Sequence, residues 1–347
     1  MTTSAKNVSL AYYREQLFAT YLDTPGLTEI AVNRPGEVWL EINGAWECRP
    51  DEAITLDACR RFAKTLAGYA GDDIDDNKPL LSATLPTGER VQVVFPPACE
   101  RGTISITIRK PSTRQIQHSE YVANGFYQFV SGGARRASVE DKLMELYQAR
   151  HIDQFIELAV AAGKTLLIAG GTGSGKTTYM KSLIAYIPAM VRLCTIEDSE
   201  EIEFFLHKNY VHLFYPSEAG NSKDAIVTPA SLLKSCFRMK PDRILLAEVR
   251  GGEAWDFLKV VGSGHSGSMT SIHAGSTAEA IEGVVERCYQ NTECQNLPYD
   301  VLKKKVLESI DVIVHVNREG SVRYMSDIYY RSADAARYRE EEEHEGI

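Results

Sequence analysis

The 347-residue sequence lacks long apolar runs. A helix that crosses a bilayer needs about 20 predominantly apolar residues, and no continuous apolar segment here approaches that length. The opening residues 1–7 also lack the apolar core of a secretory signal peptide. These absences predict a protein that works in the cytoplasm.

Cysteine is sparse and scattered. The seven cysteines lie between Cys48 and Cys294 and form no C-x-x-C pair. An odd number at such spacings argues against a disulfide framework and against a zinc site. The pattern is typical of a reduced, cytosolic protein.

An excess of positive charge is also missing. The sequence carries 38 Lys and Arg against 47 Asp and Glu, a formal net charge of −9. Broad electrostatic binding to the phosphate backbone of nucleic acid needs the opposite balance. Direct nucleic-acid binding is therefore not expected, and a nucleic-acid translocase is disfavoured.

What the sequence does contain is a phosphate-binding loop. Thr165–Ala169 predicts a buried strand, and the pattern G-x-x-x-x-G-K-T follows it before a predicted helix. Glycines let backbone N–H groups surround a triphosphate, while the helix N-terminus faces the anion. Lys176 suits the β- and γ-phosphates, and Thr177 suits Mg²⁺. The predicted ATP- or GTP-binding residues are Gly171, Thr172, Gly173, Ser174, Gly175, Lys176, Thr177 and Thr178.

Two further predicted strands end in acids. Arg243–Ala247 leads to Glu248, and Leu193–Ile196 leads to Glu197 and Asp198. Because ligands of parallel α/β sheets lie at the carboxyl ends of strands, Glu248 is predicted to hold Mg²⁺ or polarise the attacking water. Glu197 is a candidate general base. A helix N-cap formed by Asp198 is the alternative for this segment.

A histidine ends another predicted strand. His273 follows the glycine-punctuated segment Gly264–Gly267 and an apolar run. An imidazole beside a γ-phosphate can sense whether that phosphate is present and couple hydrolysis to movement. Because no cysteine lies near it in sequence, a zinc site is not expected.

Residues 1–110 predict a sheet-rich α+β domain. Period-two alternation places Arg90 and Arg109 on the polar faces of the last two predicted strands. Apolar residues of Val8–Leu22 recur near helical spacing and are expected to pack on their own domain. The remaining elements are a three-stranded meander over 28–48, a helix around 56–66, and strands 90–95 and 103–109.

The rest of the chain predicts a linker, an α/β domain and a tail. Residues 111–137 read as a linker with one short helix, 138–332 as a mainly parallel α/β P-loop NTPase domain, and 333–347 as an acidic tail. Ser138-x-x-Asp141 and Thr228-Pro229 predict two helix starts. The expected strands are 165–169, 191–196, 210–215, 243–247 and 268–272, followed by a hairpin of 311–317 and 322–330.

Four motifs in this order resemble the hexameric secretion ATPases, specifically the type IV secretion system traffic ATPase family, which is related to type II secretion and type IV pilus motors. Two segments of the N-terminal half, Gly88–Gln92 and Ile104–Ser112, look like that family as well. The four motifs are the phosphate loop Gly170–Thr178, the acidic box Thr195–Asp198, the second nucleotide motif Arg243–Gly251 and the histidine box Gly264–Ala274.

The resemblance implies a C-terminal RecA-like P-loop NTPase domain behind a smaller α+β domain. It also implies a two-tiered homo-hexamer that binds ATP and Mg²⁺ between its domains, with Arg90 and Arg109 reaching the phosphates. The implied partners are inner-membrane secretion-channel components, with peripheral association at the cytoplasmic face of the inner membrane. Ser271 stands where relatives commonly have threonine, which is a mild departure.

Two other functions compete with this interpretation. A type IV pilus or type II secretion motor would share all four motifs, although the tetracysteine zinc module common in type II motors is absent here. A nucleotide-gated, non-catalytic scaffold would need no water-activating acid. The intact Lys176, Thr177, Glu197 and Glu248 therefore favour a Mg²⁺-dependent ATPase that serves type IV secretion or conjugation.

Overall fold

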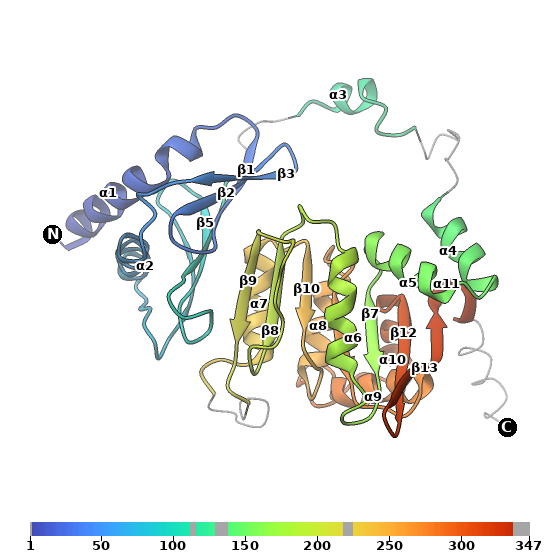
Figure 1. Cartoon of the computed structure of the whole chain (residues 1–347). Coiled ribbons are helices and arrows are strands. Elements are labelled where there is room, and N and C mark those ends of the chain that lie inside the picture. The colour runs from blue at the N-terminus through green and yellow to red at the C-terminus, as the bar shows by residue number, and fades with distance from the viewer. Residues whose placement is uncertain (1, 112–115, 129–137, 218–224, 336–347) are drawn as a thin grey trace.

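The computed structural model describes residues 2–111, 116–128, 138–217 and 225–335, and these form two separate β-sheets (Figure 1). The first sheet has six antiparallel strands in the order β3-β2-β1-β6-β5-β4. The strands are β1 Leu27–Val32, β2 Glu37–Ile42, β3 Ala45–Pro50, β4 Leu80–Thr84, β5 Arg90–Val94 and β6 Ser105–Arg109. The predicted meander and the two later strands are confirmed. The edge strand β4 was not predicted, because its five residues hold only two buried side chains in alternation.

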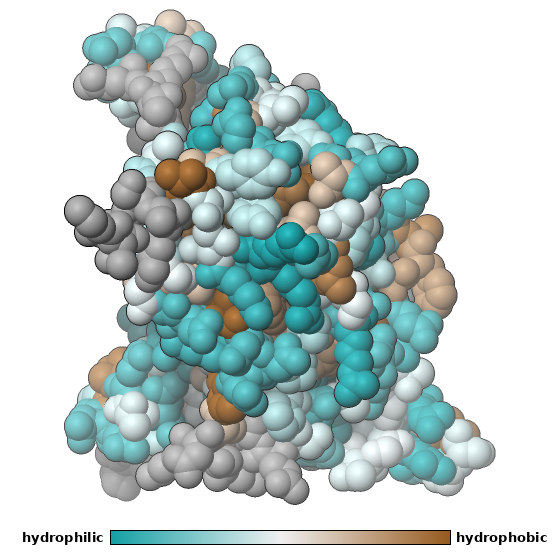
Figure 2. Space-filling view, turned by 90° about the vertical axis from the view of Figure 1, so that its left-hand side faces the viewer, coloured by the Kyte–Doolittle hydropathy of each residue, from teal (hydrophilic) through white to brown (hydrophobic). Residues whose placement is uncertain are grey.

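Two helices cover one face of this sheet. The helices α1 (Thr2–Leu22) and α2 (Leu56–Ala70) pack through a ring contact between Phe18 and Phe62, with centroids 5.1 Å apart. Leu10 and Leu17 are buried in the same core. The apolar side of the N-terminal helix therefore packs on its own domain, as its spacing predicts. Seen from this side, the molecule is mostly hydrophilic, and hydrophobic residues appear only in separate patches (Figure 2).

The opposite, polar face of the first sheet is covered as well. Gln92 and Thr107 are almost completely buried, although alternation alone leaves them on a polar face. Gln92 Nε2 lies 3.4 Å from Ser235 Oγ, and Thr107 Oγ1 accepts from Arg192 Nη2 at 3.4 Å. The C-terminal part of the chain supplies these partners. The polar face is thus a contact surface between the two halves of the chain.

The second sheet has seven strands in the order β13-β12-β7-β11-β10-β8-β9. Every neighbouring pair is parallel except β12 and β13, which form the predicted antiparallel hairpin. This confirms the predicted mainly parallel α/β domain. Its strands are β7 Leu166–Ala169, β8 Leu193–Glu197, β9 Tyr210–Phe214, β10 Arg243–Leu246, β11 Met269–Ile272, β12 Val312–Glu319 and β13 Val322–Tyr330.

Helices lie on both faces of this sheet (Figure 1). Each face has its own apolar core, as a doubly wound sheet requires. One face carries α4 Val139–Gln148, α5 Ile152–Ala161, α6 Lys176–Leu183 and the short 3-10 helix η1 Ile184–Tyr186. The other carries α7 Pro229–Met239, α8 Glu253–Val261, α9 Thr277–Cys288 and α10 Tyr299–Ser309. A short helix, α11 (Arg331–Asp334), follows β13.

The helix starts follow the predicted capping residues. The Ser138 side chain accepts from the backbone N–H of Asp141 at the start of α4, and Thr228 caps α7 with Pro229 as its first residue. A short helix, α3 (His118–Ala123), lies in the segment between the two sheets (Figure 1). Residues 131–136 of the predicted linker and the acidic run 340–343 lie outside the described residues. In the described part of the chain, no helix combines the length and apolarity that crossing a membrane requires.

Candidate active site

The sheet order brings the predicted motifs to one edge. In the second sheet β7 is followed by β11, β10 and β8, all parallel, so the carboxyl ends of these strands are neighbours. The phosphate loop follows β7, Glu248 follows β10 by two residues, and His273 directly follows β11. Segments that are about a hundred residues apart in sequence therefore meet at a common edge, as expected for ligand sites in open α/β sheets.

The phosphate loop has the backbone shape that requires glycine. Gly173 and Gly175 have φ angles of +71° and +97°, in the left-handed region. At Gly170 a Cβ atom would lie 2.4 Å from the Val316 carbonyl oxygen and 2.6 Å from Ser174 Oγ. Neither a left-handed backbone nor such a close approach admits a larger residue at these positions.

Lys176 closes over its own loop. Its ammonium donates to the carbonyl oxygens of Gly170 and Gly171 at 2.9 Å and 3.0 Å. The same Nζ lies 3.3 Å from Nδ1 of His273. Burial lowers the pKa of Lys176, and the charge of Glu248 opposes that shift. A cation with only carbonyl and imidazole partners has capacity for a stronger anionic partner.

Glu248 lies between the imidazole of His273 and the guanidinium of Arg250. Its Oε1 is 2.8 Å from Nε2 of His273, and its Oε2 accepts from Nε of Arg250 at 2.8 Å. Arg250 also donates through Nη1 to Asp198 at 2.6 Å. Burial disfavours the guanidinium charge, but the hydrogen bonds to Glu248 and Asp198 raise the pKa of Arg250 above its ordinary value. A chain of charged and polar contacts thus runs across the site from Asp198 to Lys176.

These groups line one cleft of about 340 Å³. The volume is within the range of small-ligand sites. Of the predicted residues, the cleft is lined by Thr172, Gly173, Gly175, Lys176, Thr177, Thr178, Asp198, Glu248 and His273. Ser174 is buried within the loop, and Gly171 contributes its carbonyl oxygen to Lys176.

Glu197 faces away from the cleft. Its side chain is fully buried, and Oε2 accepts the backbone N–H groups of Glu201 and Ile202, both at 2.9 Å. Residues 198–209 contain no helix, so the alternative that Asp198 caps one is wrong. In this geometry Glu197 anchors the segment that carries Glu201, and Asp198 is the member of the acidic box that lines the cleft.

Arg90 and Arg109 lie on the first sheet, outside the residues that line this cleft. They face each other as register partners on β5 and β6. Arg109 is half exposed, and its Nε is 3.5 Å from Oε1 of the buried Glu29. Within this single chain, the two arginines are brought to each other and not to the phosphate loop.

Sequence reasoning missed two charged residues of the cleft. Arg250 and Glu201 both line it, and Arg250 contacts the acids of two different motifs. Arg250 was predictable from the sequence, because it follows Glu248 by two residues in the segment after the same strand. Glu201 carried no signal of its own, because its position depends on how the loop folds back onto Glu197.

The donor set of the cleft suits Mg²⁺. Among the described residues, no group of three or more His, Cys, Asp or Glu side chains is arranged to hold a metal by itself. Magnesium in phosphate-loop sites is held by few protein ligands and by substrate phosphates. The hydroxyl of Thr177 and the carboxylate of Glu248 line the same cleft and are hard oxygen ligands of that kind.

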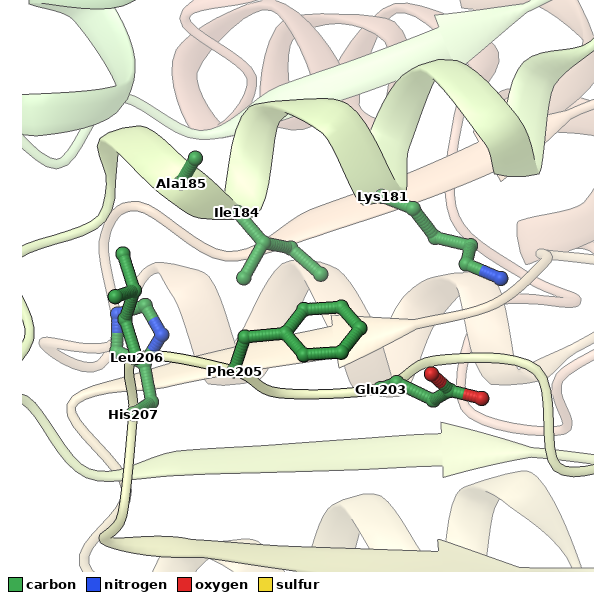
Figure 3. A pocket seen from close by; sticks show the side chains of 7 residues that line it. All are labelled: Lys181, Ile184, Ala185, Glu203, Phe205, Leu206 and His207. Carbon is green, nitrogen blue, oxygen red and sulfur yellow. The ribbon is translucent and has the colours of Figure 1, made fainter.

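A second cavity of about 340 Å³ lies at the far end of α6. Figure 3 shows the Phe205 ring beneath Ile184, with Leu206 and His207 to one side and Glu203 and Lys181 to the other. Its lining is mainly apolar, and Phe205 is 87% exposed. Its charged lining residues are Lys181 and Glu203, fewer than those of the first cleft, so we assign the chemistry to the phosphate-loop site.

The chain is similar to known secretion proteins. Residues 134–318 match the family model described as "Type II/IV secretion system protein". The chain is 45% identical over 314 residues to the type IV secretion system protein VirB11 of Brucella suis, covering 89% of this chain and 87% of that protein. It is 43% identical over 321 residues to the type IV secretion system protein PtlH of Bordetella pertussis, covering 91% and 94%.

The fold is also similar to that of a solved structure. The crystal structure of the VirB11 ATPase from the Brucella suis type IV secretion system, solved in complex with sulphate, superposes with a TM-score of 0.88 at 41% identity, covering 98% of both chains. Sequence and structure therefore lead to the same conclusion: this chain belongs to the type II/IV secretion system protein family, on its type IV secretion ATPase branch.

Proposed function

We propose that this protein is a Mg²⁺-dependent ATPase that powers assembly of, or substrate transfer through, a type IV secretion or conjugation machine. The observation that carries the proposal is the meeting of Lys176, Glu248 and His273 in one cleft beside the phosphate loop. The 45% identity to a type IV secretion protein supports the biological setting.

In this proposal, the loop N–H groups and Lys176 hold the phosphates. Lys176 exchanges the carbonyls of Gly170 and Gly171 for phosphate oxygens, which carry more negative charge. Thr177 and Glu248 would hold Mg²⁺, which when bound neutralises the charge of the β- and γ-oxygens. We expect Lys176 to leave its two carbonyl partners only when an anion is bound.

Glu248 is the better placed of the two candidate acids. It lines the cleft, whereas Glu197 is turned into the 201–202 backbone. We assign to Glu248 the orientation of the attacking water and to Glu197 the positioning of the loop. His273 contacts both Glu248 and Lys176, so its imidazole would transmit a movement of Lys176 towards the phosphates to Glu248.

The proposal extends to a homo-hexamer in which the first sheet approaches a nucleotide. Arg90 and Arg109 are neighbouring guanidiniums, and their fork geometry suits phosphate oxygens. In the ring they would reach phosphates bound at the C-terminal domain. Inner-membrane secretion-channel components would be the partners, with peripheral contact at the cytoplasmic face of that membrane.

The test compares two variants with the wild-type protein. Lys176→Ala should nearly abolish phosphate release, and Glu248→Gln should keep nucleotide binding while removing hydrolysis. Lys142→Ala, which removes an exposed cation paired with Glu145, is the matched control and should remain active. Chelation of Mg²⁺ with EDTA should stop turnover, and added Mg²⁺ should restore it. A Lys176→Ala enzyme within about twofold of wild type, which is less than ~0.5 kcal/mol of barrier, would refute the site.

A further inference from the structure

The hairpin of β12 and β13 runs beside the phosphate loop. β12 pairs in parallel with β7, and His315 is the register partner of Ala169, the last residue before the loop. The next residue of β12 places its carbonyl oxygen against Gly170, where a Cβ atom would lie 2.4 Å from it. The residues beyond Val316 therefore continue alongside the loop itself.

Two arginines of this hairpin reach the loop glycines. A Cβ atom built on Gly173 would lie 3.9 Å from Nη1 of Arg318. One built on Gly175 would lie 2.9 Å from Cδ and 3.1 Å from Nε of Arg323. The Arg323 side chain thus packs directly on the glycine that precedes Lys176. These two side chains form the outer wall of the phosphate loop.

Nothing neutralises this pair within the described residues. Arg318 and Arg323 are direct register partners across the hairpin, an arrangement that like charges destabilise. Arg318 donates through Nε to the Gly320 carbonyl at 2.7 Å, and neither guanidinium has a carboxylate partner among the residues described. The nearby Glu319 accepts instead from the Tyr324 hydroxyl at 2.7 Å. By contrast, Arg250 on the other side of the loop has two carboxylates.

The sheet order sets which part of a nucleotide the pair would meet. Glu248 and His273 come from β10 and β11, on one side of β7, while the arginine pair comes from β12 and β13 on the other. A nucleotide whose terminal phosphate faces Glu248 extends its α-phosphate and nucleoside towards the opposite side. That side is where the two unpaired guanidiniums lie.

We propose that Arg318 and Arg323 bind the α-phosphate of the nucleotide and so form a second cationic contact beside the phosphate loop. The inference rests on the proposed nucleotide site and adds the residues that hold the nucleoside end. An unpaired, exposed guanidinium gains more from a phosphate than one already held by two carboxylates. The repulsion within the pair is relieved when an anion binds to both.

The experiment measures binding of ADP, a non-hydrolysable ATP analogue and pyrophosphate to the full chain by calorimetric titration. Arg323→Ala should weaken ADP and the ATP analogue by a similar factor, roughly tenfold for one charge-assisted contact. The affinity for pyrophosphate, which occupies only the phosphate loop, should fall by less than about twofold. Arg318→Ala should behave in the same way, and Arg323→Lys should retain part of the affinity.

Arg238→Ala is the matched control, because Arg238 is an exposed arginine in the last turn of α7, at the opposite edge of the sheet. It changes net charge equally and should leave all three affinities unchanged. An equal loss of affinity for pyrophosphate and ADP would overturn the assignment. A larger loss of affinity for the ATP analogue than for ADP would overturn it as well. Unchanged nucleotide binding with loss of subunit assembly in sedimentation would assign the pair to a neighbouring copy instead. A wild-type protein that binds no nucleotide would refute the proposed function itself.

Discussion

Glu29 should make the stability of the fold depend on pH. Its side chain is only 3% exposed on β1, and burial raises its pKa from 4.5 to about 7. Arg109 lowers the pKa, the neighbouring carboxylate of Glu41 raises it, and Lys240 and Arg192 lower it from the C-terminal side. We expect Glu29→Gln to remove this dependence.

The sign follows from the raised pKa. Below pH 4.5 Glu29 is protonated in both the folded and the unfolded chain, so burial costs no ionisation energy. As the pH rises towards about 7, the unfolded chain releases this proton while the folded chain retains it, and the free energy of unfolding falls. A pKa displaced from 4.5 to about 7 corresponds to roughly 3 kcal/mol, at about 1.4 kcal/mol per pH unit.

Urea unfolding at pH 4.5 and pH 8 measures this difference, with fluorescence of the buried Trp39 and Trp46 as the probe of the first sheet. The free energy of unfolding of Glu29→Gln should equal that of the wild type at pH 4.5 and exceed it by up to about 3 kcal/mol at pH 8. Glu47→Gln is the control, because Glu47 is an exposed glutamate of the same sheet that pairs with Arg49, and its loss should stabilise the protein at neither pH. If wild type and Glu29→Gln lose the same stability between the two pH values, Glu29 does not titrate as described.

Three further outcomes follow from the same geometry. Arg250→Gln should lower kcat about tenfold with little change in KM, because Glu248 loses the contact that orients it, and unchanged phosphate release would refute this role. Arg109→Ala should weaken ATP binding more than ADP binding in titration, whereas equal losses would exclude a γ-phosphate sensor. Arg192→Met removes a buried guanidinium that donates to Asn33 at 2.7 Å across the two halves of the chain. This substitution should lower the free energy of unfolding by about 3 kcal/mol and split urea unfolding into two transitions. A single transition at the wild-type urea concentration would contradict this prediction.

The sequence by itself determined most of the strands, several helix starts and the phosphate loop. Gly170–Thr178 specifies its loop through the only residue type that tolerates the backbone there, and Ser138 and Thr228 specify helix starts through local hydrogen bonds. Glu248 and His273 were predictable for a related reason. The carboxyl ends of parallel strands lie at the same edge of a sheet, so a residue that follows one strand lies near residues that follow the others.

The tertiary structure alone decided which side chains meet across elements. Period-two alternation identifies a polar face at Thr107, but not that Arg192 would bury it. Glu197 and Asp198 are adjacent in sequence, yet one anchors a loop and the other lines the cleft, because the backbone that follows them turns back on Glu197. Arg323 lies against Gly175 only because β12 pairs with β7. Strand order and register depend on packing between distant segments, whereas loops and caps depend on neighbours a few residues apart.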